Sequence, residues 1–336
     1  MTEDRPGRGL LAGFDAGQTG TVCRLRLAGR DAAAEAEPLA EGGGPGVSHL
    51  AAPQGPERFT AALRESLVRA RARLADRRDP RVGWPLLAAA VGASGIEVGS
   101  EVQEQGRRLA GEALGLPPAR LVVTGDERTA LRGAFPDGAG VVVISGTGTI
   151  AVGRDATGRE RRCGGWGWLL DGAGSACDIG RDGLTLSLRM ADGRAADGPL
   201  RATLWGALDL DPAAPDTPQR IKALVVRPEF GPAGFARLAP VVDSLAAAGE
   251  PRAVAILRRN AGALAQMAAA VAHGLRLERP PVCGMGGALA HLSCFRGLFA
   301  RSLEGRLRGS EVVTPAGDAC DGALTLAAER LAQAED

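Results

Sequence analysis

The chain has 336 residues, 45% of them hydrophobic, which is enough to bury a core in each of about two domains. Its net charge of +1 gives no general attraction to nucleic acid or to an acidic membrane. No apolar run reaches the roughly 20 residues of a membrane helix, and the charged start, expected to be a disordered tail over 1–9, has no apolar leader segment. The six cysteines are scattered without a C-x-x-C pair, which favours reduced thiols over disulfides or a zinc site. We therefore expect a cytoplasmic protein that binds neither nucleic acid nor membranes.

The first half of the chain is expected to open with three strands and a helix. The strands are predicted at 10–15, 21–28 and near 34–40. A Gly/Thr turn over 16–20 separates the first two, and the third runs into the glycines at 42–46. Apolar residues at spacings of three and four, from Phe59 to Leu74, predict an amphipathic helix over 56–78.

The second half of the chain repeats this order of three strands and a Gly/Thr turn, after further elements complete the first half. A strand, a helix and a strand complete the first half, at 85–92, 100–114 and 121–124. Three further strands are expected at 141–145, 150–154 and 159–163, with a second Gly/Thr turn at 146–149. A largely helical stretch follows. After it we expect a strand at 281–283, a glycine turn at 284–287 and a helix at 294–307. A strand at 311–314 and a final helix from Asp318 complete the chain.

Each half thus opens as a strand, a Gly/Thr turn and two further strands, which indicates an internal duplication. The expected fold class is α/β, with two mixed sheets covered by helices. The N-terminal lobe is expected over 10–138, completed by a C-terminal helix over 320–336, and the C-terminal lobe over 139–319. A ligand is expected in the cleft between two such halves.

Both Gly/Thr turns combine hydroxyl donors with glycines, which let backbone N–H groups approach a phosphate closely. Asp15 stands directly before the first turn, where its carboxylate could hold Mg²⁺ directly or through water. Two facing turns of this kind would hold the phosphates of one nucleotide. The alternative is a pair of ordinary β-hairpin turns, which also favour glycine.

Asp126 comes shortly after the apolar residues at 121–123, and the carboxyl ends of such strands are where ligands collect in α/β sheets. The same aspartate could equally cap the N-terminus of the helix expected over 128–134. The two roles do not exclude each other.

A glycine-rich stretch over 163–176 contains Trp166 and Trp168, in a chain with only 3% aromatic residues. Glycines free backbone groups for hydrogen bonding, and indole faces suit the C–H surface of a sugar. The helix that opens at Gly174-Ser175 adds an N-terminus that favours anions. Structural tryptophans are the alternative. The glycine turn over 284–287 suits the close approach of an adenine or a ribose.

Together these motifs resemble the N-acetylglucosamine kinase/BadF-type family, also written BadF-BadG-BcrA-BcrD ATPases. The resemblance covers about residues 10–330. Its matching segments are Gly13–Thr19, Thr124–Asp126, Pro136–Gly138, Val141–Thr149, Cys163–Gly167, Gly174–Ala176 and Gly284–Ala288. It implies a two-lobed actin-like (ribonuclease H-like) fold, the cofactors ATP and Mg²⁺, and phosphorylation of an amino-sugar hydroxyl, usually at carbon 6 of glucosamine or N-acetylglucosamine.

The resemblance also implies residue roles. Asp126 takes the role of the general base and Asp15 that of the Mg²⁺ ligand, while Thr19 and Thr147 would contact ATP phosphates. The implied ATP-binding positions are Asp15, Gly17, Thr19, Gly146, Thr147, Gly148, Ala233, Gly286 and Gly287. The implied sugar-binding positions are Ser48, Ser94, Gly165, Trp166 and Asp171.

One stretch departs from the family pattern. Where the family has Gly-Asp-Glu-Gly-Ser, with the Asp contacting the sugar, this chain reads Asp-Gly-Ala-Gly-Ser over 171–175, which places Gly172 and Ala173 at the two acidic positions. We expect this loss to open space beside Trp166 and Trp168. Glucosamine or a bulkier amino-sugar derivative is then preferred over N-acetylglucosamine, because two hydrogen-bonding groups are gone.

Other functions stay open at this level. The family's early sugar-reading Asn is missing, with Ser48 and His49 as the nearest candidates, and this with the altered stretch also fits a sugar-binding sensor or pseudokinase. A BadF-type ATPase without sugar kinase activity, or a kinase for another sugar or a polyol, is a further alternative. The absence of paired cysteines argues against an iron–sulfur activator of a radical dehydratase and against the Cys-rich zinc loop of ROK-type kinases. The expected partner is a small-molecule sugar, and a homodimer is an open alternative to a monomer.

Overall fold

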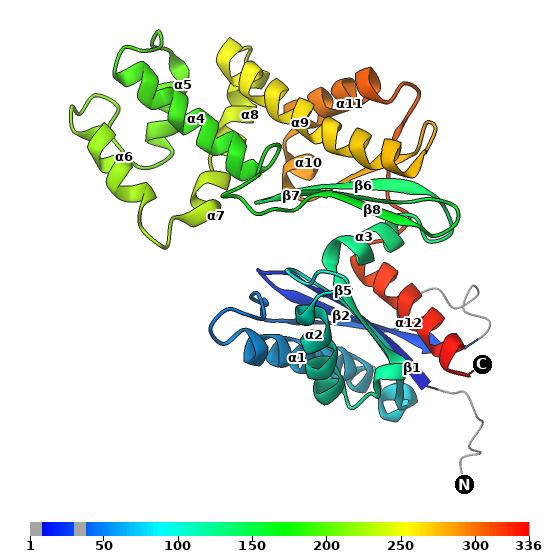
Figure 1. Ribbon diagram of the computed structural model, residues 1–336. Coiled ribbons are helices and arrows are strands. Elements are labelled where there is room, and N and C mark those ends of the chain that lie inside the picture. The colour runs from blue at the N-terminus through cyan, green and yellow to red at the C-terminus, as the bar shows by residue number, and fades with distance from the viewer. Residues whose placement is uncertain (1–8, 30–37, 336) are drawn as a thin grey trace. The chain divides into compact units, whose positions relative to one another are not determined.

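A computed structural model of the chain describes residues 9–29 and 38–335 (Figure 1). The chain forms two compact units. Unit 1 comprises the residues up to Asp137 together with those from Pro315, and unit 2 comprises Gly138–Thr314. The tail predicted over 1–9 lies outside the described residues except for Gly9, which begins the first strand.

Unit 1 contains a five-stranded mixed sheet in the order β3-β2-β1-β4-β5. The strands are β1 (Gly9–Ala16), β2 (Thr21–Ala28), β3 (Ala40–Gly44), β4 (Leu86–Ala93) and β5 (Leu121–Gly125). β2 is antiparallel to both β1 and β3, whereas β1, β4 and β5 run parallel. Because helices cover both faces, β1 is apolar except for Asp15 near its end, and Leu10 and Leu11 are buried on opposite sides.

The unit 1 helices lie on both faces of this sheet (Figure 1). They are α1 (Gly55–Asp76), α2 (Glu101–Leu114), α3 (Asp126–Ala134) and α12 (Ala319–Glu335), with short 3₁₀ turns at Pro80–Gly83 and Pro118–Arg120. The stripe from Phe59 to Leu74 predicted the buried face of α1 correctly, and the burial of a side chain such as Phe59 contributes roughly 1.5–3 kcal/mol. α12 packs on the opposite face through Ala323, Leu324 and Ala327.

The third strand lies later than predicted. Residues 30–37 are outside the described part of the chain, and β3 begins only at Ala40 and runs to Gly44. Its glycines are therefore the strand itself and not a loop after it. A side chain at Gly42 would overlap the backbone of α1 at Ser66 and Ala70, so a glycine strand lets this helix pack directly on the sheet.

Unit 2 contains a second five-stranded sheet with the same topology. Its strands are β6 (Gly140–Ser145), β7 (Thr149–Arg154), β8 (Glu160–Gly164), β9 (Val282–Met285) and β10 (Val312–Val313). The order β8-β7-β6-β9-β10 and the strand directions match those of β3-β2-β1-β4-β5. The duplicated α/β architecture predicted from the sequence is thus confirmed.

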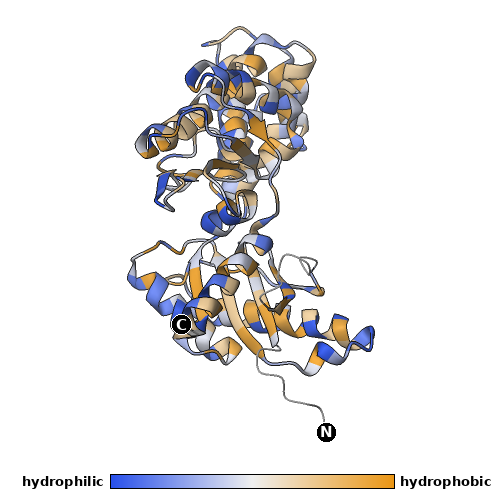
Figure 2. Ribbon diagram, turned by 90° about the vertical axis from the view of Figure 1, so that its right-hand side faces the viewer, coloured by the Kyte–Doolittle hydropathy of each residue, from blue (hydrophilic) through white to orange (hydrophobic). Residues whose placement is uncertain are grey.

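The helices of unit 2 form the rest of its core. They are α4 (Ala176–Ala191), α5 (Pro199–Gly206), α6 (Thr217–Val225), α7 (Gly231–Ala236), α8 (Ala239–Ala247), α9 (Pro251–Leu275), α10 (Gly287–His291) and α11 (Ser293–Arg306). α9 lies against β6, β7 and β8 and also packs on α11. Figure 2 shows hydrophobic and hydrophilic residues alternating along the helices, as expected for elements with one buried face. Among the described residues, no helix is both long and apolar enough to cross a membrane.

The chain returns to unit 1 at Pro315, ahead of the predicted residue 320. The N–H groups of Ala316 and Gly317 donate hydrogen bonds to the carbonyls of Ala134 and Gly133 at 3.2 and 2.9 Å. These bonds fasten the segment before α12 to the end of α3, which is why residues 315–319 belong to unit 1.

Candidate functional site

Three parallel strands of unit 1, β1, β4 and β5, end side by side. Ala16 of β1 is in register with Ala93 of β4, which is in register with the last residue of β5. Asp15 therefore lies at the end of β1, Ser94 directly follows β4, and Asp126 directly follows β5. Ligands of α/β sheets bind at the carboxyl ends of the strands. The sheet thus brings three sequence-predicted site residues to one edge.

The carboxylates of Asp15 and Asp126 are half-buried and repel each other. Burial, followed by the negative charges of Asp126 and Asp318, raises the pKa of Asp15 to about 6. Burial also raises the pKa of Asp126, although hydrogen bonds with Glu127 and with backbone groups oppose the rise. A desolvated pair of like charges favours a bound cation or proton, and such pairs are typical of functional sites.

The alternative prediction, that Asp126 is the N-cap residue of the following helix, is wrong. Gly125 is the N-cap of α3, and Asp126 is the first residue inside the helix. A carboxylate in the first turn is still stabilised by the helix dipole, and the Asp126 carbonyl accepts a 2.9 Å hydrogen bond from the Thr129 hydroxyl. The backbone around Asp126 is therefore held by both β5 and α3.

The first Gly/Thr turn is closed by a 3.0 Å hydrogen bond from the Gly17 N–H to the Gly20 carbonyl. Thr19 is exposed at the turn. The Val47 N–H donates to the Gly17 carbonyl at 3.0 Å, which holds Ser48 close to the turn. The turn does join two antiparallel strands, so the hairpin geometry considered above is present, and it leaves the Thr19 hydroxyl free to meet a ligand.

The predicted sugar-side positions of unit 1 lie near this turn. The Ser94 N–H donates a 3.1 Å hydrogen bond to the Ala16 carbonyl, so Ser94 stands beside the end of β1. The Ser48 hydroxyl is buried without a hydrogen-bond partner among the described residues, whereas His49 is exposed. An orphaned buried hydroxyl is uncommon in a folded protein, which marks Ser48 as a group that a ligand would satisfy.

The fit of a Mg²⁺ ion can be judged from the acidic groups. The described residues contain no group of three or more His, Cys, Asp or Glu side chains that could hold a metal by themselves. Mg²⁺ commonly binds through one or two carboxylates together with nucleotide phosphates and water. The Asp15 carboxylate, desolvated and facing other negative charges, fits that mode of binding.

The second Gly/Thr turn, in unit 2, is closed by a 3.0 Å hydrogen bond from the Gly146 N–H to the Gly148 carbonyl. Thr147 and Gly148 are exposed. Gly286 packs against Ser145, the last residue of β6. The ideal Cβ of Gly286 would lie 2.5 Å from the Ser145 carbonyl oxygen, and the φ of Gly286 is +87°. Two predicted nucleotide motifs, 146–148 and 286–287, therefore meet at the end of β6.

The glycine- and tryptophan-containing loop over 165–175, here called the sugar loop, is fastened to the same turn. The Gly165 N–H donates to the Thr149 carbonyl at 2.9 Å, and the Ala176 N–H donates to the Gly146 carbonyl at 2.8 Å. The Thr149 hydroxyl donates to the Ala173 carbonyl at 3.2 Å. The loop ends at Ser175, whose hydroxyl caps α4, the helix predicted to open at Gly174-Ser175. Unit 2 thus places the sugar loop next to its Gly/Thr turn.

The two tryptophans have different environments. Trp166 is 59% exposed, with the Arg162 guanidinium 5.2 Å above its ring. Trp168 packs on Phe235 of α7, and its carbonyl accepts a hydrogen bond from Arg181 at 3.1 Å. The indole of Trp166 is therefore available to a ligand, whereas Trp168 has a structural role.

The space predicted at Gly172 is occupied by Asp178, on the side of the loop near Trp168. The ideal Cβ of Gly172 would lie 2.8 Å from Oδ1 of Asp178 and 3.4 Å from Cα of Trp168. Asp178, on the first turn of α4, forms an ion pair with Arg181. Burial raises the pKa of Asp178, and the Arg181 charge opposes this rise. Sequence reasoning missed Asp178, because an aspartate in a first helical turn looks like an ordinary helix-stabilising residue.

The remaining predicted positions stand apart from this network. Asp171 is exposed on the sugar loop, and Ala233 is exposed on α7. α7 packs on α4, where Gly180 meets the backbone of Phe235. The roles assigned to Asp171 and Ala233 stay predictions.

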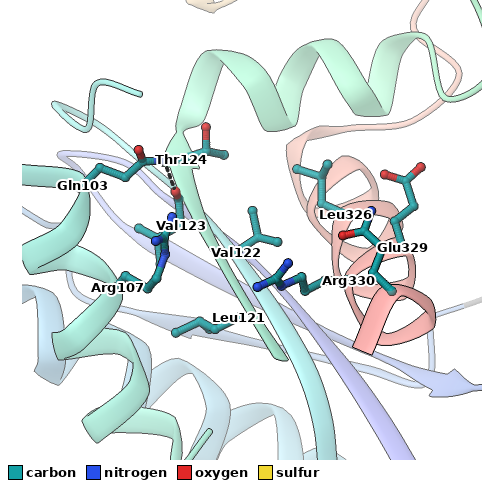
Figure 3. Close-up of a pocket in the computed structure, with 10 residues that line it drawn as sticks. Gln103, Arg107, Leu121, Val122, Val123, Thr124, Leu326, Glu329 and Arg330 are labelled. Atoms are coloured by element: carbon teal, nitrogen blue, oxygen red, sulfur yellow. Dashed lines mark hydrogen bonds between the residues drawn. The ribbon is translucent and has the colours of Figure 1, made fainter. Parts of the chain in front are cut away.

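A separate pocket of about 300 Å³ lies beside β5, between α2 and α12 (Figure 3). Arg107 of α2 and Arg330 of α12 flank the strand, and the Gln103 side-chain amide donates a 2.7 Å hydrogen bond to the Val123 carbonyl. The pocket is lined by Gln103, Arg107, Leu121, Val122, Val123, Thr124, Leu326, Glu329, Arg330 and Gln333. None of the predicted site residues lines it.

Comparison with known proteins places these features in context. The N-acetylmuramic acid/N-acetylglucosamine kinase of Clostridium acetobutylicum is 27% identical over 210 residues, covering 62% of this chain and 67% of that protein. A solved structure from Chromobacterium violaceum, provisionally named an N-acetylglucosamine kinase, is 29% identical with a TM-score of 0.69, over 96% of this chain and 100% of that one. A provisionally named N-acetylglucosamine kinase from Porphyromonas gingivalis shares the fold, with 17% identity and a TM-score of 0.66 over 96% of this chain and 99% of that one.

The family comparison covers nearly the whole chain. The model of the BadF/BadG/BcrA/BcrD ATPase family matches residues 12–327, which include both Gly/Thr turns, Asp126 and the sugar loop. The similarity predicted from those motifs is thereby confirmed, together with the two-lobed actin-like fold class that it implied. The chain belongs to the BadF/BadG/BcrA/BcrD ATPase family.

Proposed function

We propose that the protein is an ATP-dependent kinase that phosphorylates a hydroxyl of an amino sugar, at carbon 6. The observation that carries this proposal is the placement of Asp15 and Asp126 at the ends of β1 and β5, on either side of β4, with mutually unfavourable buried charges. Enzymes that transfer a phosphoryl group to an alcohol commonly use one carboxylate to hold Mg²⁺ and a second to accept the proton of the hydroxyl. Membership of an ATPase family supports the use of ATP.

Asp126 acts as the general base in this mechanism. The hydroxyl oxygen of the sugar forms a bond to the γ-phosphorus as the bond from that phosphorus to the bridging oxygen breaks, and ADP leaves. The proton of the hydroxyl passes to the Asp126 carboxylate. Burial raises the pKa of Asp126, and a more basic carboxylate is a better acceptor for this proton.

The proposed nucleotide-binding groups are backbone and hydroxyl groups of the two Gly/Thr turns. In this proposal the exposed Thr19 and Thr147 hydroxyls and the glycine backbones beside them donate hydrogen bonds to phosphate oxygens. Asp15 would hold Mg²⁺, which when bound supplies positive charge that offsets the charge of the phosphates. Gly287, whose ideal Cβ would meet no atom closer than 3.9 Å, leaves room for the nucleoside beside the second turn, and Gly286 lets the chain pass close to Ser145.

The sugar is proposed to bind along the sugar loop, against the exposed face of Trp166. Ser48 and Ser94 are further proposed sugar-binding residues. Leu169 and Leu170 are 75% and 84% exposed in the same loop, so it offers apolar surface to a sugar with a large substituent. One relative is named for N-acetylmuramic acid as well as N-acetylglucosamine. We propose glucosamine or a bulkier derivative such as N-acetylmuramic acid as the preferred substrate.

The test is an ADP-release screen with Mg-ATP against glucosamine, N-acetylglucosamine, N-acetylmuramic acid, N-acetylmannosamine, glucose and no sugar. We expect release to depend on an amino sugar, and the product to carry phosphate at carbon 6 by NMR. Equal release without sugar would contradict the proposal and identify an ATPase without sugar kinase activity. Sugar-dependent thermal stabilisation without turnover would instead identify a sensor.

A further inference from the structure

A buried clamp holds Gly174 of the sugar loop from two sides. The Gly174 N–H donates a 2.9 Å hydrogen bond to Oδ1 of Asn260, on α9. The Gly174 carbonyl accepts a 2.6 Å hydrogen bond from the Ser145 hydroxyl, at the end of β6. Ser145 and Asn260 are 0% and 2% exposed. Gly174, near the end of the loop, thus has both backbone groups paired with buried side chains from two different elements.

The orientation of the Asn260 side chain is determined by its other contacts. Its Nδ2 group donates to Asp182 Oδ2 at 2.9 Å and to the Ile256 carbonyl at 3.0 Å. Asp182 is in turn paired with Arg259 at the surface. Both amide hydrogens therefore point away from the loop, and the amide oxygen is left to accept from Gly174.

The clamp is also connected to the Gly/Thr turn. Ser145 is the residue directly before that turn, and the Ala176 N–H donates to the Gly146 carbonyl at 2.8 Å. Gly174 itself has a φ of +90°, and its ideal Cβ would approach the Asn260 carbonyl oxygen and Leu264 Cβ at 3.1 Å. The loop backbone is therefore confined by α9 on one side and by the end of β6 on the other.

We propose that Asn260 is a positioning residue: by holding Gly174 on α9, it makes the sugar loop rigid together with the Gly146–Gly148 turn, to which Ser145 bonds the same glycine. This inference rests on the proposed kinase function. Because the two segments cannot move independently, a sugar that fixes the loop also fixes the turn in the geometry that binds phosphate. Binding of one ligand then lowers the entropic cost of fixing the protein segment that binds the other ligand. Sugar and nucleotide therefore each increase the affinity for the other.

The physical basis is the free-energy cost of losing one of the two hydrogen bonds that hold Gly174. Removal of the Asn260 or the Ser145 side chain leaves one buried backbone group of Gly174 without its hydrogen-bond partner. We expect this loss to shift the equilibrium from the fixed toward the released loop by about tenfold or more. The catalytic groups of unit 1 are untouched by such a change. We therefore expect a loss of coupling and not a uniform loss of nucleotide binding.

The experiment measures the dissociation constant of Mg²⁺ with a non-hydrolysable ATP analogue, with and without saturating sugar, using whichever amino sugar the wild type phosphorylates fastest. In the wild type, the sugar is expected to tighten nucleotide binding. In Asn260→Ala and Ser145→Ala, this tightening is expected to fall toward onefold and KM for the sugar to rise about tenfold, while the sugar-free nucleotide constant stays within about twofold.

Asp182→Asn is the matched control. The new amide oxygen still accepts from Asn260 Nδ2, so the clamp persists and the coupling is expected to match the wild type, although the pairing with Arg259 is lost. If Asn260→Ala is too unstable to purify, the coupling measured in Ser145→Ala tests the inference by itself. That variant removes the hydrogen bond to the Gly174 carbonyl and leaves α9 unchanged.

Two results would overturn the inference. Wild-type coupling in a folded Asn260→Ala or Ser145→Ala variant would show that the clamp does not connect the two segments. Absence of sugar-dependent ADP release in the wild type would overturn the proposed function, and this inference with it. The first result leaves the kinase proposal intact, so the two failures are distinguishable.

Discussion

Gly172 of the sugar loop faces the carboxylate of Asp178 on α4, with only 2.8 Å between its ideal Cβ and Asp178 Oδ1. An acidic side chain at this loop position, as in the family pattern, would meet a second carboxylate. Asp178 and the glycine are therefore matched: the helix supplies a negative charge where the loop lacks one. We predict that the substrate preference depends on this relationship.

Restoring the family pattern should require a change at Asp178. The triple variant Asp171→Gly, Gly172→Asp, Ala173→Glu is expected to be less stable than the wild type, because carboxylates at 172 and 178 would repel and overlap. Adding Asp178→Asn should recover part of the melting temperature, because it removes the charge repulsion but not the overlap. A triple variant as stable as the wild type would contradict this view of the loop.

The same variants test substrate preference. We expect the wild type to favour glucosamine or N-acetylmuramic acid over N-acetylglucosamine, and the quadruple variant to shift toward N-acetylglucosamine. The measurement is the ratio of kcat/KM values among these sugars. A wild type that favours N-acetylglucosamine tenfold, about 1.4 kcal/mol of transition-state discrimination, would exclude the prediction.

Asp126→Asn should abolish most of the turnover while leaving nucleotide binding nearly unchanged. The amide cannot accept the proton of the sugar hydroxyl, and general bases contribute about 10²–10⁴-fold to rates. We expect kcat to fall by at least about 10²-fold in a steady-state assay. Asp137→Asn, an exposed carboxylate of the same unit, is the control and should retain activity. Normal turnover of the Asp126 variant would assign that residue a structural role only.

Thr19→Val and Thr147→Val should each weaken Mg-ATP binding by about 1 kcal/mol, the typical worth of one hydrogen bond. Mg-ATP should also raise the melting temperature of the wild type, because it binds the folded state. Thr157→Val is a suitable control, since Thr157 is an exposed threonine in the β7–β8 turn. Millimolar Mg-ATP without any thermal shift would argue strongly against a nucleotide site.

Gly286→Ala and Gly287→Ala should differ although they are neighbours. At Gly286 a methyl group would lie 2.5 Å from the Ser145 carbonyl oxygen at a φ of +87°, whereas the nearest atom to one at Gly287 is 3.9 Å away. We expect the first variant to lose roughly 1–3 kcal/mol or more of stability and the second to keep the wild-type melting temperature. Calorimetry of both variants provides the comparison, and equal melting temperatures would contradict it.

Much of the architecture was predictable from the sequence because repeated local patterns encode it. Gly/Thr turns between apolar strands recur in both halves, and this recurrence predicted two duplicated mixed sheets, whereas the order of their five strands came from the structure. Asp126 was predictable because an apolar strand leads directly to it. The third strand was misplaced because glycines usually mark loops, while here Gly42 permits the close packing of α1 on the strand.

The sequence by itself determined the duplicated α/β fold, the two Gly/Thr turns and the position of Asp126 after β5, because each depends on residues that are near one another along the chain. Only the tertiary structure decided that Asp178 fills the space at Gly172 and that Asn260 clamps Gly174. These pairs are separated in sequence and belong to different elements. Their contact follows from the way α4 and α9 pack around the end of β6, which hydrophobic periodicity does not specify.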